Sequence, residues 1–204
     1  MQPQIVNLFK EVTSLKKTFI SIASIIILGL IIISINYSLT YNIGNNMKDI
    51  EINLKKDINK TLPNLPKQYD YHIVYTSDID NKKYVLSLLN DKLIFSELKK
   101  GINNKFKINS VTWGFDSFRS EIIEINKKRY FIVFGENYKM QMNYVITSIN
   151  GHEYRANIPP KQYFISYCPV PSSTQLGVQD PDCKIFDKGN RNVTNDILLN
   201  NLKK

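Results

Sequence analysis

The sequence predicts an α+β protein in which one N-terminal transmembrane helix continues into a short helical stalk and then a mainly antiparallel β-sheet domain. Three observations carry this prediction. No charged residue lies between Lys17 and Lys48, an apolar stripe at helical spacing follows, and strand-like runs joined by short turns fill much of the remaining chain. These features place a tail at 1–17, a span at 18–41, a stalk with a proline linker at 42–66, and a domain with one or two packed helices at 67–204.

The uncharged stretch has the length and composition of a membrane span. A bilayer core is about 30 Å thick and a helix rises about 1.5 Å per residue, so roughly 20 apolar residues cross it. A cleavable signal peptide would have a shorter apolar region and a small-residue cleavage site. No such site follows the run, and Tyr37 and Tyr41 stand one turn apart, where an interfacial aromatic belt is expected. We therefore expect an uncleaved anchor in the lipid bilayer.

Charge and cysteine usage together predict the orientation of the anchor. The lysines on the two flanks nearly balance, but Lys16 and Lys17 abut the span whereas Lys48 stands further away. The only two cysteines, Cys168 and Cys183, lie close together in the large domain, which favours a disulfide in an oxidising compartment. We expect a cytoplasmic N-terminus, a single pass through the cell inner membrane and a periplasmic domain. Two unrelated free thiols are the alternative interpretation of the cysteines.

The formal net charge of +9 comes from scattered lysines and not from one basic cluster. No lysine run interleaves with aromatic residues, as a platform for nucleic acid would require. A solvated basic surface is the preferred interpretation, and no nucleic-acid partner is expected. The abundance of Lys, Asn and Ile is typical of AT-rich bacterial genomes.

An apolar stripe beyond the span predicts that the membrane helix runs outward to about Lys60. The stripe ends before Pro63 and Pro66, which break helices. Two such stripes would pack as a short coiled coil and make a homodimer through the stalk. In the alternative interpretation the stripe covers its own domain. The candidate stalk interface residues are Met47, Ile50, Leu54 and Ile58.

The predicted domain begins with an ambiguous segment and continues with strands. Asp80 is placed to cap a helix over Asn81–Asn90, although a hairpin turning at Asn90-Asp91 fits the same residues. After Gly101 the pattern favours strands. The predicted hairpins are Arg119–Asn126 with Arg129–Gly135, and Lys139–Ile149 with His152–Ile158 across Asn150-Gly151; Gln162–Tyr167 is a further strand and a short helix follows Thr194.

The segment between the two cysteines is rich in proline and reads as an exposed, stiff loop. A disulfide at its base would close a loop of about 15 residues and contribute on the order of 3 kcal/mol. In one interpretation the loop is a contact surface, and in the other the bridge only fastens the C-terminal strand. The contact candidates in this loop are Pro169, Val170, Pro171, Leu176 and Val178.

No catalytic, cofactor-binding or metal-binding residues are predicted. His72 and His152 are the only histidines, and neither stands at metal-ligand spacing. The nucleophile elbow, the phosphate-binding loop and the dinucleotide fingerprint are all missing from the sequence. We therefore expect a protein that is not an enzyme and that uses no cofactor.

In its layout of short tail, single span at 18–41 and compact outer domain, the chain resembles the small bitopic partners of membrane-tethered bacterial transcription regulators. It resembles scaffold subunits of secretion systems more loosely. These resemblances imply a regulatory accessory role, or a role in an assembly complex, exerted by binding another envelope protein. A C-terminal cysteine loop behind an apolar helix also resembles type IV pilin-like subunits, so a structural subunit of a surface fibre is the alternative. The leader ending in glycine and the glutamate within the span, which pilins carry, are missing here.

Overall fold

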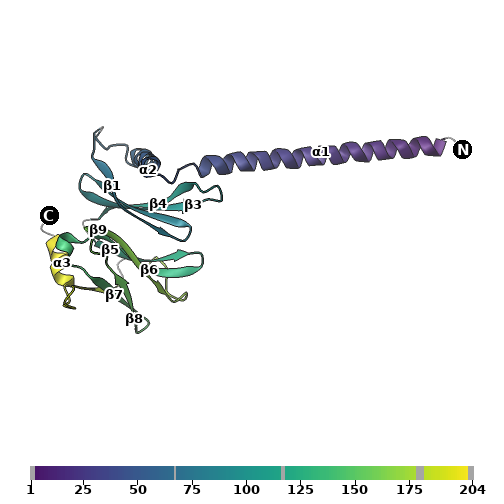
Figure 1. Ribbon diagram of the computed structural model, residues 1–204. Helices are drawn as coiled ribbons and strands as arrows, with labels where there is room; N and C mark the ends of the chain where they lie inside the picture. Colours follow the sequence, from purple (N-terminus) through teal and green to yellow (C-terminus); the bar gives the residue numbers. More distant parts are fainter. Residues whose placement is uncertain (1–2, 67, 116–117, 178–181, 202–204) are drawn as a thin grey trace. The chain divides into compact units, whose positions relative to one another are not determined.

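The computed structural model describes residues 3–66, 68–115, 118–177 and 182–201, and it divides into two units, Met1–Asn42 and Ile43–Lys204. In the first unit α1 (Pro3–Thr40) is one uninterrupted helix (Figure 1). Its segment Ile20–Thr40 is long and apolar enough to cross a membrane and is not buried against the rest of the chain. Such a helix is compatible with a single-pass anchor and also with a signal sequence.

The helix predicted to run on from the span into the stalk is interrupted after Thr40. A second helix, α2 (Met47–Thr61), begins at Asn46, whose side-chain oxygen accepts a hydrogen bond from the Asp49 N–H at 2.8 Å. Gly44 lies in the turn between the helices, where a Cβ would stand 2.2 Å from a carboxylate oxygen of Asp49. The prediction of a continuous rod is wrong because a tight turn and a new N-cap separate the two helices.

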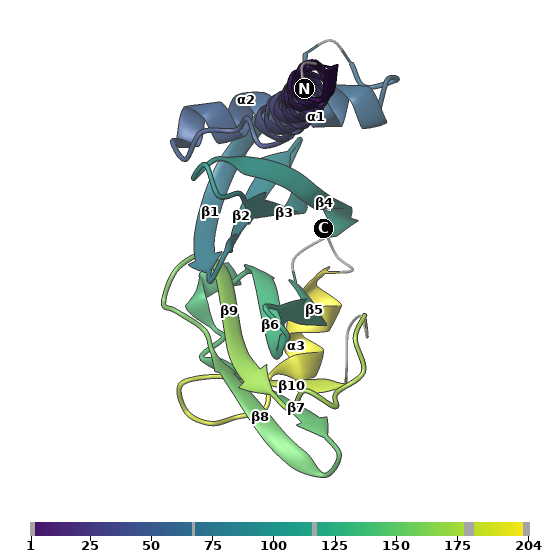
Figure 2. The same ribbon diagram turned by 90° about the vertical axis from the view of Figure 1, so that its right-hand side faces the viewer.

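Three antiparallel sheets follow α2, so the predicted α+β class with a mainly antiparallel sheet structure is confirmed. The four-stranded sheet has the order β1-β2-β3-β4, the central sheet β5-β6-β9 and the third sheet β10-β7-β8. Figure 2 shows these sheets one after another in the domain. Their strands are β1 (Tyr71–Ile79), β2 (Lys82–Leu89), β3 (Lys92–Lys100), β4 (Phe106–Phe115), β5 (Phe118–Ile125), β6 (Lys128–Glu136), β7 (Tyr144–Ile149), β8 (His152–Asn157), β9 (Tyr163–Val170) and β10 (Cys183–Phe186), with α3 (Thr194–Asn201) at the end.

Three buried clusters hold the layers together. The first joins α2 to the outer face of the four-stranded sheet. The second fills the space between the four-stranded and central sheets, where the rings of Phe95 and Phe134 stack with 3.7 Å between centroids. The third lies between the central and third sheets and includes Ile197 of α3. The central sheet is therefore buried on both faces, with Phe131 and Val133 on one side and Ile132 and Phe134 on the other.

The apolar stripe of α2 faces the domain's own sheet. Ile50, Leu54 and Ile58 are at most 1 % exposed and pack with residues of β2 and β3, whereas Met47 is 48 % exposed. These three side chains are therefore core residues in this structure and are not available as a pairing surface. The alternative interpretation, in which the stripe covers its own domain, describes what is found.

The predicted helix over Asn81–Asn90 is wrong, because this segment forms β2. Both faces of β2 are buried: Tyr84 and Leu86 face the central sheet, while Val85 and Leu89 face α2. Such a strand lacks the alternation of apolar and polar residues that marks a half-exposed strand. The alternative hairpin is the one observed, and Asn90 and Asp91 have the positive φ angles of 47° and 65° that a type I′ turn requires.

The later hairpins are confirmed, with some shifts at their ends. β7 and β8 pair across Asn150-Gly151, whose φ angles are 53° and 78°. β5 and β6 turn one residue earlier than predicted, at Asn126-Lys127, because Ile125 pairs with Lys128. The segment before β7 is not a strand and holds instead the short 3-10 helix η1 (Tyr138–Met140).

Candidate functional site

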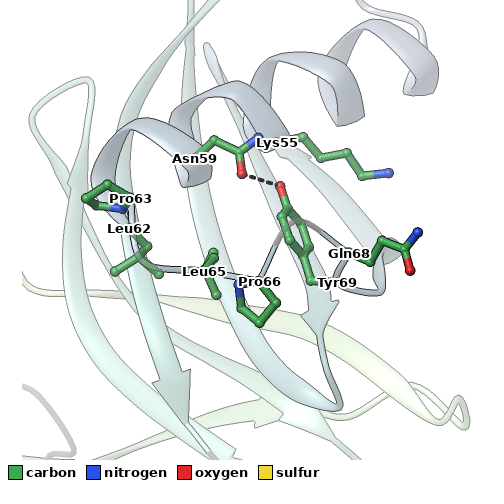
Figure 3. A pocket seen from close by; sticks show the side chains of 8 residues that line it. All are labelled: Lys55, Asn59, Leu62, Pro63, Leu65, Pro66, Gln68 and Tyr69. Carbon is green, nitrogen blue, oxygen red and sulfur yellow. Dashed lines mark hydrogen bonds between the residues drawn. The ribbon is translucent and has the colours of Figure 1, made fainter.

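A hollow of ≈ 610 Å³ lies where the end of α2 meets the linker to β1 (Figure 3). Two prolines, two leucines and a tyrosine supply its apolar surface, and three polar side chains complete it. Figure 3 shows that these side chains come from the last turns of α2 and from the linker alone. The lining residues are Lys55, Asn59, Leu62, Pro63, Leu65, Pro66, Gln68 and Tyr69.

The shape of the hollow follows from how α2 ends. The Leu62 N–H donates to the Ile58 carbonyl at 2.8 Å and closes the last helical turn. Pro63 has no N–H to continue the helix, and the chain turns back so that the Leu65 N–H donates to the Leu62 carbonyl at 3.2 Å. The prolines therefore hold the linker away from the helix axis and open a recess beside it.

Tyr69 ties the far end of the linker to the helix. Its hydroxyl donates to Oδ1 of Asn59 at 2.8 Å, the dashed line in Figure 3. The next residue, Asp70, exchanges hydrogen bonds with Asn90 at the β2–β3 turn: its carbonyl accepts from the Asn90 N–H at 3.0 Å and its N–H donates to Oδ1 at 3.1 Å. The linker is thus fastened at both ends, and the tyrosine ring is held at the hollow.

Among the residues that the structure describes, Lys55 contributes the charged side chain of this lining. Its Nζ pairs with a Glu51 carboxylate oxygen at 2.9 Å and lies 5.6 Å from the centroid of the Tyr71 ring. The remaining lining offers proline, leucine and tyrosine surface with amide groups at Asn59 and Gln68. Such a recess is suited to receive an apolar or proline-containing segment, with the amides fixing its orientation.

The loop that follows β9 borders a second hollow of ≈ 360 Å³. Arg129 donates from its guanidinium to the Thr174 carbonyl, and the Gly177 N–H donates to the Ile122 carbonyl at 3.2 Å. Hydrogen bonds to β5 and β6 therefore hold this loop. The Thr174 hydroxyl is buried without a hydrogen-bond partner among the described residues. The lining residues are Ile122, Ser148, Ile149, Asn150, Ser173, Thr174 and Gln175.

The predicted disulfide between Cys168 and Cys183 is not formed in the structure. Cys168 lies on β9 of the central sheet, whereas Cys183 begins β10 of the third sheet, where its Sγ is 3.9 Å from Oγ of Ser120. Both side chains pack against the cluster between these sheets. Proximity in sequence therefore did not predict a bridge correctly. Burial raises the pKa of Cys168 to about 11.

The predicted loop contacts fall into three groups. Pro169 and Val170 are the last residues of β9. Val170 is a core residue of the cluster between the central and third sheets. Pro171 and Leu176 are exposed on the loop. Val178 lies outside the described residues.

The structure also reveals a charged network that the sequence did not predict. The Glu97 carboxylate accepts from Lys82 Nζ at 2.9 Å, from the Asn109 amide at 2.7 Å and from the Tyr84 hydroxyl at 3.2 Å. Lys82 also donates to the Glu124 carbonyl of the central sheet at 3.0 Å. Burial, followed by the Glu97 charge, raises the pKa of the Tyr84 hydroxyl. The network joins the four-stranded and central sheets, which makes it a structural element of the fold.

No cluster of three metal-ligating side chains occurs among the described residues. The His72 Nδ1 lies 3.5 Å from a carboxylate oxygen of Asp70 at an exposed site, and His152 is exposed at the start of β8. The hollow at the end of α2 was missed at the sequence level because Pro63 and Pro66 were interpreted only as helix breakers. The available signal was a pair of prolines followed by Tyr69 in a short linker between two ordered elements.

The thiol chemistry of Cys168 provides a direct check on the absence of the predicted disulfide. In the Cys183→Ser variant of the folded chain at pH 8, we expect Cys168 to alkylate about a hundredfold more slowly than in the urea-unfolded chain. A thiol with its pKa raised by two units has about one hundredth of the thiolate. The rate should rise steadily as the pH approaches 11. An intact mass of the native chain lower by two hydrogen atoms would instead show a disulfide and contradict the structure.

Comparison of the chain with protein-family models, with curated proteins and with solved structures gives no match.

Proposed function

We propose that this chain is a non-enzymatic, single-pass inner-membrane protein of a bacterium whose outer domain binds another envelope protein and regulates or stabilises it. The observation that carries the proposal is the hollow at the end of α2, a recess with proline, leucine and tyrosine surface beside a helix that belongs to the domain core. Among the described residues, its lining supplies contact surface and amide hydrogen-bonding groups. The partner segment is an extended apolar or proline-containing stretch.

The position of the anchor supports a role at the membrane. The segment Ile20–Thr40 has the length and composition of a span, and only residues 41 and 42 separate α1 from the compact unit that begins at Ile43. The domain therefore works close to the membrane surface. Because the predicted disulfide is not formed, the proposed periplasmic location rests on Lys16 and Lys17, which abut the span on the side assigned to the cytoplasm.

A regulatory accessory role is favoured over an assembly role within this proposal. The described lining of the hollow comes from one helix end and one linker, so the hollow suits one short docked segment. A single docked segment suits a protein that holds another in one state.

Site-specific photocrosslinking in intact cells tests the proposal. A photoreactive amino acid replaces Gln68 at the hollow in one full-length variant and Gln162, an exposed glutamine next to β9, in the control. We expect the probe at 68 to capture one envelope protein, identified by mass spectrometry, and the capture to disappear when Pro66→Asp is added. Equal capture from both positions, or capture unaffected by Pro66→Asp, would contradict the assignment of this hollow.

A further inference from the structure

We infer that the β3–β4 turn is a second membrane contact, in which Ile102 enters the interface of an anionic bilayer while Lys99, Lys100 and Lys105 bind its headgroups. This inference rests on the anchor included in the proposed function. It adds a surface through which the folded domain itself binds the lipid.

The turn presents an apolar residue in an ordered frame. Ile102 is 92 % exposed, more than any other large apolar side chain of the described domain. The Gly101 N–H donates to the Lys105 carbonyl at 2.8 Å, and the Asn104 N–H donates to the Gly101 carbonyl at 3.1 Å. Asn104 has the positive φ of 58° that closes the turn. The isoleucine is therefore held outward by backbone hydrogen bonds.

The charges around Ile102 have one sign. Lys99 and Lys100 precede the turn and Lys105 follows it, and all three side chains are exposed. No acidic residue occurs between Lys99 and Lys107. By contrast, the first lysine after the span, Lys48, is followed closely by Asp49 and Glu51. An apolar tip surrounded by lysines has the composition of segments that bind anionic membrane surfaces.

A short covalent connection and one backbone bridge link this turn to the segment that follows the apolar helix. Ile43 and Phe106 exchange backbone hydrogen bonds of 3.0 and 2.8 Å, and Lys105 is the residue before Phe106. Three residue steps connect Thr40 to Ile43, which span at most about 11 Å when fully extended. The covalent tether and this bridge therefore limit how far the lysines stand from the membrane end of α1, whatever orientation the domain takes.

Because the domain that carries the β3–β4 turn is joined directly to the anchor, lipid is the partner that this turn binds. Between Lys17 and Lys48 the span and its flank carry no lysine of their own, so headgroups at the outer end meet cations only from the folded domain. The turn supplies three of them within seven residues, Lys99, Lys100 and Lys105. Electrostatic attraction and insertion of a single apolar residue reinforce each other at an interface.

Fluorescence quenching on the reconstituted full-length chain tests the inference. Residue 102 is replaced by cysteine in a Cys168→Ser, Cys183→Ser background and carries a polarity-sensitive label; the control label is at Glu153→Cys on β8 of the third sheet. The measurement uses vesicles of phosphatidylcholine mixed with phosphatidylglycerol. There we expect the acrylamide quenching constant of the label at 102 to be at least about threefold smaller than that of the label at 153. In phosphatidylcholine alone the difference should shrink.

Charge reversal separates lipid binding from simple burial. A triple variant with all three lysines of the turn reversed should restore the access of acrylamide to the label; its substitutions are Lys99→Glu, Lys100→Glu and Lys105→Glu. The control variant reverses three exposed lysines elsewhere on the domain and should leave the label protected; its substitutions are Lys127→Glu, Lys128→Glu and Lys188→Glu. Hydrogen exchange of the Ile102–Asn104 amides in the unmodified chain gives the same comparison between lipids without any substitution.

Two negative results are distinguishable. If the chain resists alkaline carbonate extraction but the label at 102 is as accessible as that at 153, the inference fails and the anchor stands. If carbonate extracts the chain from the vesicles, the anchor and the inference fail together. Equal protection in both lipid mixtures would overturn the role of the lysines.

Discussion

Replacing Glu97 with alanine is expected to lower the free energy of unfolding by about 3 kcal/mol. Glu97 and Lys82 are largely buried, with side chains 9 % and 16 % exposed, so loss of the carboxylate leaves a lysine charge with poor access to water. The Tyr84 hydroxyl and the Asn109 amide lose their acceptor in the same step. Urea denaturation of the full chain in detergent, followed by fluorescence of the single Trp113, measures the change.

The chain contains a matched control for this substitution. Glu51 and Lys55 on α2 form an ion pair with the same distance of 2.9 Å, but their side chains are 35 % and 40 % exposed. Glu51→Ala should therefore cost no more than about 0.5 kcal/mol. Equal effects of the two substitutions would show that burial between the sheets does not determine the strength of the network.

Replacing Leu54 with alanine is expected to cost about 3 kcal/mol of stability, because Leu54 is 1 % exposed at the centre of the cluster between α2 and the four-stranded sheet. Met47→Ala on the same helix is the control. Met47 is 48 % exposed and should change the stability by no more than about 0.5 kcal/mol.

These two substitutions also separate the two interpretations of the α2 stripe. If the stripe paired two chains, Met47→Ala and Leu54→Ala would both weaken a dimer while leaving the stability of the domain nearly unchanged. Sedimentation of the detergent-solubilised chain, measured beside the denaturation curves, distinguishes a folding defect from a dissociation defect.

Local turn chemistry made the hairpins predictable. Asn150-Gly151 adopts the positive φ angles that its residue types tolerate, so short-range sequence was sufficient there, whereas the turn at Asn90-Asp91 was only the alternative to a predicted helix. The choice of a helix for β2 failed because a strand buried on both faces carries no periodic signal. Its identity depends on contacts with α2 and with the central sheet, which are distant from it in sequence.

Long-range packing explains the other departures. The helical stripe of α2 was predicted from its spacing, but spacing cannot show whether the partner is another chain or the sheet that begins at Tyr71. The cysteines are close in sequence, yet β9 and β10 belong to different sheets. The hollow depends on the turn of the linker after Pro63 and on the Tyr69–Asn59 hydrogen bond, and no local sequence pattern predicts that bond.

The proposed function requires that the hollow at the end of α2 sustain another envelope protein. The most direct test measures the level of the captured partner in membranes of cells that produce the wild-type chain, Pro66→Asp, Pro160→Asp or no chain. Pro160 is an exposed proline remote in sequence from the hollow. We predict that the partner co-purifies with the wild-type chain and the Pro160→Asp variant, and that its level falls with Pro66→Asp and with the deletion. A chain that purifies alone, and whose deletion leaves every envelope complex intact, would contradict the account.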